Sequence, residues 1–310
     1  IGDVDGAGVN TIDYDTGAID LLLGYAIGAN QLVSANFYSS AEESSHTDTF
    51  TGGTDGTYDS AHYGRNQFTV PTLMASYEGI YALSRIEELM QVVLPDFAGD
   101  VTTTKDLLDY ADGRQSRPAG GDRFIILVVP QDSTATEAVD WVRFQLNQYS
   151  KYAAIYWPWV KIANPLADNR PMVFPPLGHL AGIYARTDST RNVGKAPAGT
   201  VDGALKFLLS LEMVSEQGER DYVYPNRINP LISSPQTGMC VWGTRTLSLD
   251  SAWRYIPTTR LFMFVEKSIF NSTHWIVFEP NGPSLWSRIK AQIQGFLLGL
   301  FNDGLFAGST

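Results

Sequence analysis

Side chains that could act as nucleophiles, bases or metal ligands are few among the 310 residues. The histidines and cysteine are His46, His62, His179, His274 and Cys240. A catalytic cysteine needs a histidine partner, and the sequence places none beside Cys240. Because Cys240 stands in an apolar run, Met239-Cys240-Val241-Trp242, we expect it to be a small buried side chain.

Metal and phosphate motifs are incomplete. His46 and His62 lie in a polar segment, and their spacing matches no short zinc motif. Gly194-Lys195 is followed by Ala196, where a phosphate-binding loop needs Ser or Thr. Asp3-Val4-Asp5-Gly6 lacks the further ligands and the closing Glu of a calcium loop. We therefore predict no catalytic residue, no metal and no cofactor.

Two alternative functions remain open at this level. An α/β hydrolase-like enzyme could use Asp188, His179 and Glu279 for acid–base catalysis, provided that they converge in one pocket. A carbohydrate- or receptor-binding module could use the polar residues 39–66 with an exposed row of aromatic side chains. Tryptophan is also enriched in cores and protein interfaces, which is what we expect for most of those in this chain.

Composition limits the class of protein. The formal net charge of −11 argues against general binding to nucleic acid or to anionic membranes. The hydrophobic content of 44% is enough for a substantial core. No apolar stretch reaches the roughly 20 residues needed to cross a bilayer. The chain opens with Ile1 in a Gly- and Asp-rich stretch, which we interpret as a cut end rather than a signal peptide.

Alternating strand and helix patterns organise the middle of the chain. Residues 124–130 and 153–157 are continuous apolar runs typical of buried strands, and 134–149 has helical spacing between them. This order predicts an α/β domain with a mixed, mostly parallel sheet flanked by helices. Further expected elements are a strand at 92–94, strands at 240–247 and 253–256, helices at about 73–88, 103–111, 201–212 and 258–270, and loops over most of 161–200.

The N-terminal part has a different character. Residues 11–19 have apolar positions on both sides of a Gly-bearing turn, which predicts a β-hairpin or strand pair. Residues 39–66 are rich in Ser, Thr, Gly and Asp, and we expect a long exposed loop or an arm. We predict a β-rich segment at 1–69, part of an inserted or outer domain, followed by an α/β core at 70–310. The whole chain is then α+β.

The clearest helix pattern covers residues 283–302. Its apolar side chains form one broad stripe, made of Leu285, Trp286, Ile289, Ile293, Phe296, Leu297, Leu300 and Phe301. Burying each large side chain contributes about 1.5–3 kcal/mol before entropy is counted. The stripe must therefore pack against its own domain or against a neighbouring molecule.

Several short motifs, in order, resemble the contractile tail sheath protein family of phages and related injection machines. They are 152–160 with its aromatic-Pro-Trp-Val ending, 175–188 with Pro-Pro and Arg-Thr-Asp, Lys195-Ala196-Pro197-Ala198, Asn229-Pro230, 238–247 with Val-Trp-Gly-Thr-Arg-Thr-Leu, 253–256, Phe278-Glu279-Pro280-Asn281, Leu285-Trp286 and 304–308. Thr244 stands where the family often has Ala, and Thr259 where it often has Arg. The family usually continues beyond the position of Gly308, so we expect a core fragment truncated before the C-terminal arm.

The resemblance implies a structural, non-enzymatic function in the virion. Sheath subunits stack as sixfold rings around a tail tube and rearrange from an extended to a contracted state, which drives the tube through the host envelope. Implied partners are other sheath subunits, joined through terminal arms and core surfaces, the tail tube protein, and the baseplate and tail terminator proteins. Assembly would take place in the host cytoplasm. Neither direct nucleic-acid binding nor membrane insertion is implied.

Basic residues near the C-terminal end are candidates for subunit or tube contacts. They are Arg254, Arg260, Lys267, Arg288 and Lys290.

Overall fold

The computed structural model describes residues 79–306, apart from 87, 115–120 and 166–167, and the backbones of four strands before them. The chain divides into two compact units, Ile1–Gly79 and Ile80–Thr310, and each is described by itself. The assignment of 1–69 to an outer domain and of 70–310 to a core domain stays a prediction.

The first unit contains two strand pairs. β1 (Thr11–Ile12) and β2 (Ile19–Asp20) are antiparallel, with Ile12 opposite Ile19, which confirms the strand pair predicted for 11–19. β3 (Val33–Ser39) and β4 (Glu42–Phe50) are also antiparallel. The loop or arm predicted for 39–66 is therefore wrong at β4, because backbone pairing with β3 forms a strand that polar side chains do not signal. The rest of that segment lies outside the described residues.

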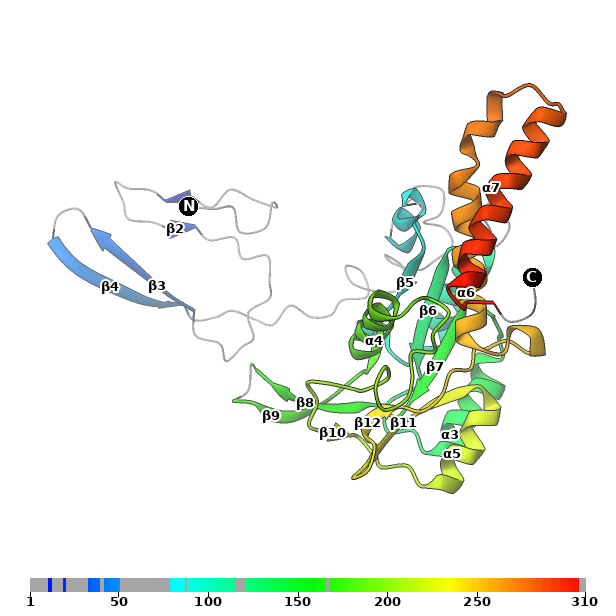
Figure 1. Cartoon of the computed structure of the whole chain (residues 1–310). Helices are drawn as coiled ribbons and strands as arrows, with labels where there is room; N and C mark the ends of the chain where they lie inside the picture. The colour runs from blue at the N-terminus through cyan, green and yellow to red at the C-terminus, as the bar shows by residue number, and fades with distance from the viewer. Residues whose placement is uncertain are drawn as a thin grey trace. The chain divides into compact units, whose positions relative to one another are not determined.

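The second unit is built on a five-stranded sheet in the order β12-β11-β7-β6-β5 (Figure 1). Its strands are β5 (Met90–Val92), β6 (Arg123–Val128), β7 (Ala153–Trp157), β11 (Ile228–Ser234) and β12 (Gly238–Val241). The first four are parallel, and β12 returns antiparallel to β11. β6 and β7 are buried along their whole length, as their continuous apolar runs require. The predicted mixed, mostly parallel sheet is confirmed.

Helices cover both faces of this sheet. On one side pack α2 (Val101–Gly113), α3 (Ala135–Asp140) with its π-helical continuation η5 (Trp141–Leu146), and α5 (Gln217–Val223) with η6 (Tyr224–Asn226). On the opposite side of the sheet from α3 and α5 lies α4 (Leu177–Thr190) (Figure 1). Thr134 begins α3 with a capping box to Glu137. The predicted helix 134–149 ends earlier, because Asn147 adopts a left-handed backbone with φ 44°.

A smaller antiparallel sheet follows β7. It consists of β8 (Val160–Asn164), β9 (Arg170–Phe174) and β10 (Ser210–Leu211), in the order β10-β8-β9. The loops predicted over 161–200 are therefore wrong for β8, β9 and α4. The helix predicted for 201–212 is also wrong, because this segment bonds to strands. The amides of Gly199 and Leu205 donate to the carbonyls of Val241 and Met239 at 2.9 Å each, so residues 199–205 cover the outer edge of β12.

The C-terminal part is a helical hairpin. α6 (Ile256–Ser272) and α7 (Pro283–Asn302) are joined through η8 (His274–Phe278), and the pair projects away from the sheet (Figure 1). α7 has the predicted bounds. The strand predicted for 253–256 is wrong, since η7 (Ser251–Trp253) and the start of α6 occupy it and only the Arg245–Tyr255 bridge is β-like.

Two short 3-10 helices remain, η2 (Gly79–Arg85) and η3 (Pro95–Phe97). η2 occupies part of the helix predicted for 73–88, whose first residues lie outside the description. Within the described residues, none of the helices has both the length and the apolar content for a membrane span.

Candidate assembly interface

A partly buried ion pair joins the base of the helical hairpin to α4, which packs on the sheet. Arg260 of α6, only 3% exposed, donates from Nη1 and Nη2 to the Oδ1 and Oδ2 of Asp188 at 2.9 and 2.5 Å. Asp188 also accepts a bond of 3.4 Å from Gln91 of β5. The guanidinium lies 4.9 Å from the ring centroid of Tyr184, so Arg260 meets a carboxylate and an aromatic ring of the same helix, α4.

Burial differs between the two helices of the hairpin. The buried residues of α6 are Ile256, Thr259, Arg260, Leu261, Met263 and Lys267. In the described part of α7, Leu285 alone is buried, at 8% exposure. The packing of the α7 stripe against its own domain is therefore incomplete: Leu285 is buried, Trp286 is exposed, and the other side chains of the stripe are partly exposed.

Polar and aromatic contacts hold the two helices together. Trp275 Nε1 donates to Gln292 Oε1 at 3.0 Å, and Gln292 Nε2 donates to the Ser272 carbonyl at 2.8 Å. The rings of Phe264 and Phe296 meet with centroids 6.4 Å apart. Because these contacts join α6 to α7 directly, the hairpin keeps its shape with little help from the sheet.

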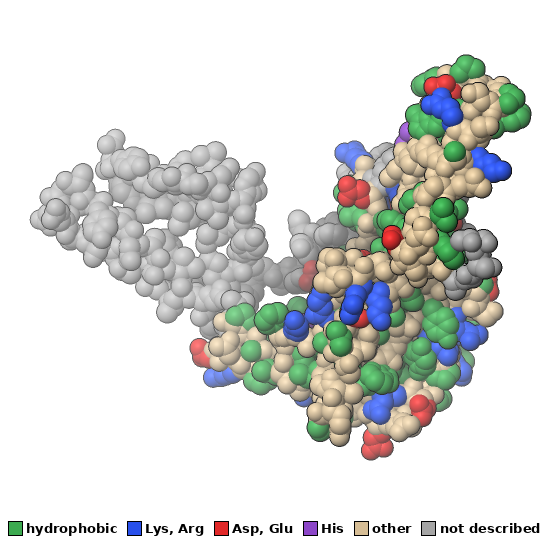
Figure 2. Space-filling model, viewed as in Figure 1, with side chains coloured by type: hydrophobic (Ala, Val, Ile, Leu, Met, Phe, Trp, Pro, Cys, Tyr) green, Lys and Arg blue, Asp and Glu red, His purple; other side chains and the backbone are tan. Residues whose placement is uncertain are grey.

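The outer surface of the hairpin carries large exposed apolar side chains. Their exposed fractions are Phe262 46%, Val277 69%, Phe278 98%, Trp286 58% and Leu298 51%. Figure 2 shows hydrophobic side chains at the far end of the hairpin. Clustered exposed apolar surface of this kind marks protein interaction sites.

The predicted basic contact residues divide into two groups. Arg254, Arg288 and Lys290 are exposed, and Arg288 lies 4.3 Å from the Trp275 ring centroid and 3.9 Å from Glu279. Arg260 is paired inside the subunit, and Lys267 is 7% exposed with its amine 5.5 Å from the Phe270 ring centroid. An interface role for all five stays a prediction.

A hollow of about 380 Å³ lies between α4, β9 and the segment before β10. Its lining includes Phe174, Gly178, His179, Gly182, Ile183, Arg186, Ala204, Lys206 and Phe207. Burial lowers the pKa of His179, and its Nδ1 lacks a hydrogen-bond partner among the described residues. Phe207 is 93% exposed and holds a left-handed backbone with φ 61°, which is costly for a bulky residue. Such strain clusters at functional surfaces.

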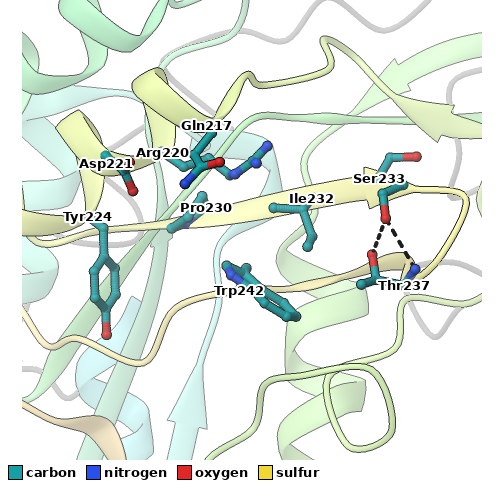
Figure 3. Close-up of a pocket in the computed structure, with 10 residues that line it drawn as sticks. Gln217, Arg220, Asp221, Tyr224, Pro230, Ile232, Ser233, Thr237 and Trp242 are labelled. Carbon is teal, nitrogen blue, oxygen red and sulfur yellow. Dashed lines mark hydrogen bonds between the residues drawn. The ribbon is translucent and has the colours of Figure 1, made fainter.

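A second hollow, of about 500 Å³, lies beside α5 (Figure 3). Gln217 and Arg220 come from α5, whereas Trp242 follows β12 and is 48% exposed. Ser234 and Thr237 close one end, their hydroxyl oxygens being 2.8 Å apart. This hollow mixes both charges, because Asp221 stands beside Arg220.

Two of the motifs that carried the family resemblance, Asn229-Pro230 and the segment 238–247, meet inside the subunit. Buried Asn229 donates to the carbonyls of Ile155 and Arg245 and accepts from the Arg245 amide at 2.6 Å, which ties β11 to β7 and to the segment after β12. A Cβ on Gly243 would lie 2.8 Å from the Asn229 oxygen, so only glycine allows this approach. The sequence indicated the importance of Asn229 only through its motif, since it cannot show these long-range partners.

The residues of the hydrolase alternative do not converge. Asp188 pairs with Arg260, and Glu279 lies near Arg288 at the far end of the hairpin. Neither lines the hollow that contains His179. The arrangement that this enzyme would need is absent from the described residues.

The aromatic row of the binding-module alternative is also not found in the described part of the chain. Trp141, Trp157 and Trp159 are buried, and Trp242 and Trp286 are exposed on separate elements.

Cys240 is buried and free, as predicted. No cluster of three or more potential metal ligands occurs among the described residues. His62 and the side chain of His46 lie outside the description.

Comparison with known proteins identifies relatives. Residues 78–247 match the family described as phage tail sheath protein central domain. The tail sheath protein of Vibrio phage KVP40 is 29% identical over 160 residues, covering 51% of this chain and 24% of that protein. The match thus spans about a quarter of this curated relative.

Solved structures of contractile systems share the fold. A baseplate structure of the anti-feeding prophage, 6-fold symmetrised, matches with a TM-score of 0.60 and 27% identity over 74% of this chain and 57% of its own. The sheath complex of the extracellular contractile injection system PVC, in the contracted state, matches with a TM-score of 0.60 and 31% identity over 74% and 59%. Since the family match covers more than half of the 310 residues, the chain belongs to the phage tail sheath protein family.

Proposed function

We propose that this chain is the α/β core of a structural subunit that polymerises with copies of itself into a contractile tail sheath. The observation that carries the proposal is the hairpin, in which Leu285 is the only buried residue of the described α7 while Trp286 and Leu298 stay exposed. Surface of this kind stabilises an assembly by about 25 cal/mol per Å² of apolar area removed from water, before association costs.

The subunit is suited to move as a rigid body. The Arg260–Asp188 pair fixes the hairpin to α4, and Asn229 fixes the far side of the sheet. In contraction, subunits held internally in this way would change their packing against one another, while terminal arms keep them connected. Arg260 would then act by positioning the hairpin, whereas Arg254, Arg288 and Lys290 would lie at the rim of subunit or tube contacts.

The finer proposal is that subunits stack as sixfold rings around the tail tube. Their passage from an extended to a contracted state drives the tube through the host envelope. Two relatives support it, the 6-fold symmetrised baseplate and the contracted sheath complex. Partners would be other sheath subunits, the tail tube protein, and baseplate and terminator proteins. Assembly would occur in the host cytoplasm and the product would reside in the virion, with structural contacts rather than catalysis as its function.

The test uses the full-length protein that carries this chain. Trp286→Ser combined with Leu298→Ser should abolish sheath tubes seen by electron microscopy, because both side chains lie on the outward surface of α7. The melting temperature should stay close to that of the unmodified protein, since exposed side chains contribute little to folding. Tubes of normal length and number from this variant would contradict the proposal.

A further inference from the structure

We propose that the hairpin tip of one subunit, Phe278-Glu279, inserts into the α4 hollow of a second copy, with Phe278 on the hollow's apolar floor and Glu279 beside Lys206 and Arg186. The inference rests on the proposed self-assembly and assigns one contact within it.

The tip offers an apolar side chain that the described residues leave uncovered. Phe278 is 98% exposed at the end of η8, and Val277 before it is 69% exposed. The next residue, Glu279, is exposed and lies 3.9 Å from Arg288, too far for a strong bond. The tip therefore presents an aromatic ring followed directly by a carboxylate.

The hollow offers the complementary surface. Gly178 and Gly182 lie one turn apart on α4, and a Cβ added at either meets no atom within 4 Å. Ile183, Phe174 and Phe207 provide apolar walls around this open space. A volume of about 380 Å³ is ample for a phenyl ring and its neighbours. The strained and exposed Phe207 gains contacts when an aromatic side chain enters.

Charge favours this hollow over the one beside α5. Among the described residues, the charged side chains that line it are Arg186 and Lys206, both basic, and Lys206 is exposed. The hollow beside α5 carries Asp221 as well as Arg220, so it offers no net positive charge to Glu279. The hairpin tip fits this hollow because its aromatic ring can meet the apolar walls while the carboxylate that follows it meets the basic side chains.

The contact must join two copies. Neither Phe278 nor Glu279 lines the hollow of its own subunit. A contact between a tip on one copy and a hollow on the next is head-to-tail, and contacts of this type build helical filaments when they do not close.

Cross-linking tests the contact directly. In the full-length protein, Lys206→Cys together with Glu279→Cys is treated with a short bis-maleimide before and after tube assembly. We expect a ladder of covalent multimers from tubes and none from unassembled subunits. Each single-cysteine variant is the control, and Cys240 is buried and should not react.

Charge reversal provides the second measurement. Lys206→Glu or Glu279→Lys alone should raise the protein concentration needed for tubes by about tenfold, because like charges would face each other across the contact. The two reversals together should restore that concentration to within about threefold. Unchanged melting temperatures show that the variants fold.

The outcomes separate this contact from the general function. Tubes without a ladder, or single reversals that assemble as the unmodified protein does, overturn the contact and leave self-assembly standing. A cross-link within unassembled subunits also overturns it, since the hairpin tip would then reach the hollow of its own subunit. An unmodified full-length protein that forms no tubes overturns both.

Discussion

Arg260 and Asp188 are 72 residues apart in sequence, yet two hydrogen bonds join them at the base of the helical hairpin. Arg260 has a side chain only 4% exposed, and that of Asp188 is 25% exposed. Together with the buried Ile256 and Met263 of α6, this pair holds the base of the hairpin against the rest of the subunit. The geometry of any surface on the hairpin depends on it.

Removing one partner of this pair should be costly. We expect Asp188→Ala to lower the free energy of unfolding by about 3 kcal/mol, because the buried guanidinium loses its counter-charge. Urea unfolding of the purified protein measures it. The matched control is Arg288→Ala, whose pair with Glu279 is exposed and 3.9 Å long; we expect a loss below about 1 kcal/mol. Equal losses for the two variants would refute the anchoring role.

Replacing Asn229 should lower the free energy of unfolding as much as replacing a core apolar residue does. Asn229→Ala leaves the carbonyls of Ile155 and Arg245 and the Arg245 amide without their side-chain partner. We expect a loss of about 3 kcal/mol in the free energy of unfolding, from several buried groups left unsatisfied. Asn271→Ala, on the exposed side of α6, should change it by less than about 0.5 kcal/mol. A tolerated Asn229→Ala would show that other contacts hold β11 to β7.

Two leucines on α7 separate folding from assembly. Leu285 is 8% exposed and Leu298 is 51% exposed. We expect Leu285→Ala to cost about 2–3 kcal/mol in the free energy of unfolding through the cavity that it leaves, and Leu298→Ala less than about 1 kcal/mol. In the full-length protein, Leu298→Ala should nevertheless reduce tube formation, measured by sedimentation. If it left tube formation unchanged, this part of α7 would not be an interface.

Ionisation of Glu212 should make the free energy of unfolding depend on pH. Burial, and then its hydrogen bond to the Asp132 carboxyl, raise the pKa of Glu212 above the value of a free glutamate. The folded protein thus binds more protons than the unfolded chain between those two pKa values, so stability contributed by this group falls as pH rises through that interval.

Glu212→Gln removes the effect because glutamine does not ionise. We expect its urea midpoint to exceed that of the unmodified protein above the raised pKa, and the difference to shrink as pH falls toward about 4. Asp132→Asn, which removes the neighbouring carboxyl, should also reduce the fall of stability with pH. Parallel pH profiles for all three proteins would contradict this assignment.

Hydrophobic runs and helical periodicity in the sequence predicted the buried strands and the C-terminal helix correctly. The apolar runs at 124–130 and 153–157 gave buried parallel strands, since such runs need cover on both faces. The stripe of α7 gave a helix with the correct bounds, because 3.6-residue periodicity and the early proline both act within the helix. The order of the short motifs indicated the family that the comparison confirms.

Tertiary structure decided where long-range pairing overrides local propensity. Residues 201–212 have helical spacing but extend along other strands, because the edge of β12 supplies backbone partners. The sequence could not tell whether the α7 stripe packs on its own domain or on a neighbour, since periodicity fixes which side chains share a face and not what covers that face. In the folded chain Leu285 of this stripe is buried, Trp286 is exposed, and Arg260 joins Asp188, and these environments exist only once distant segments meet.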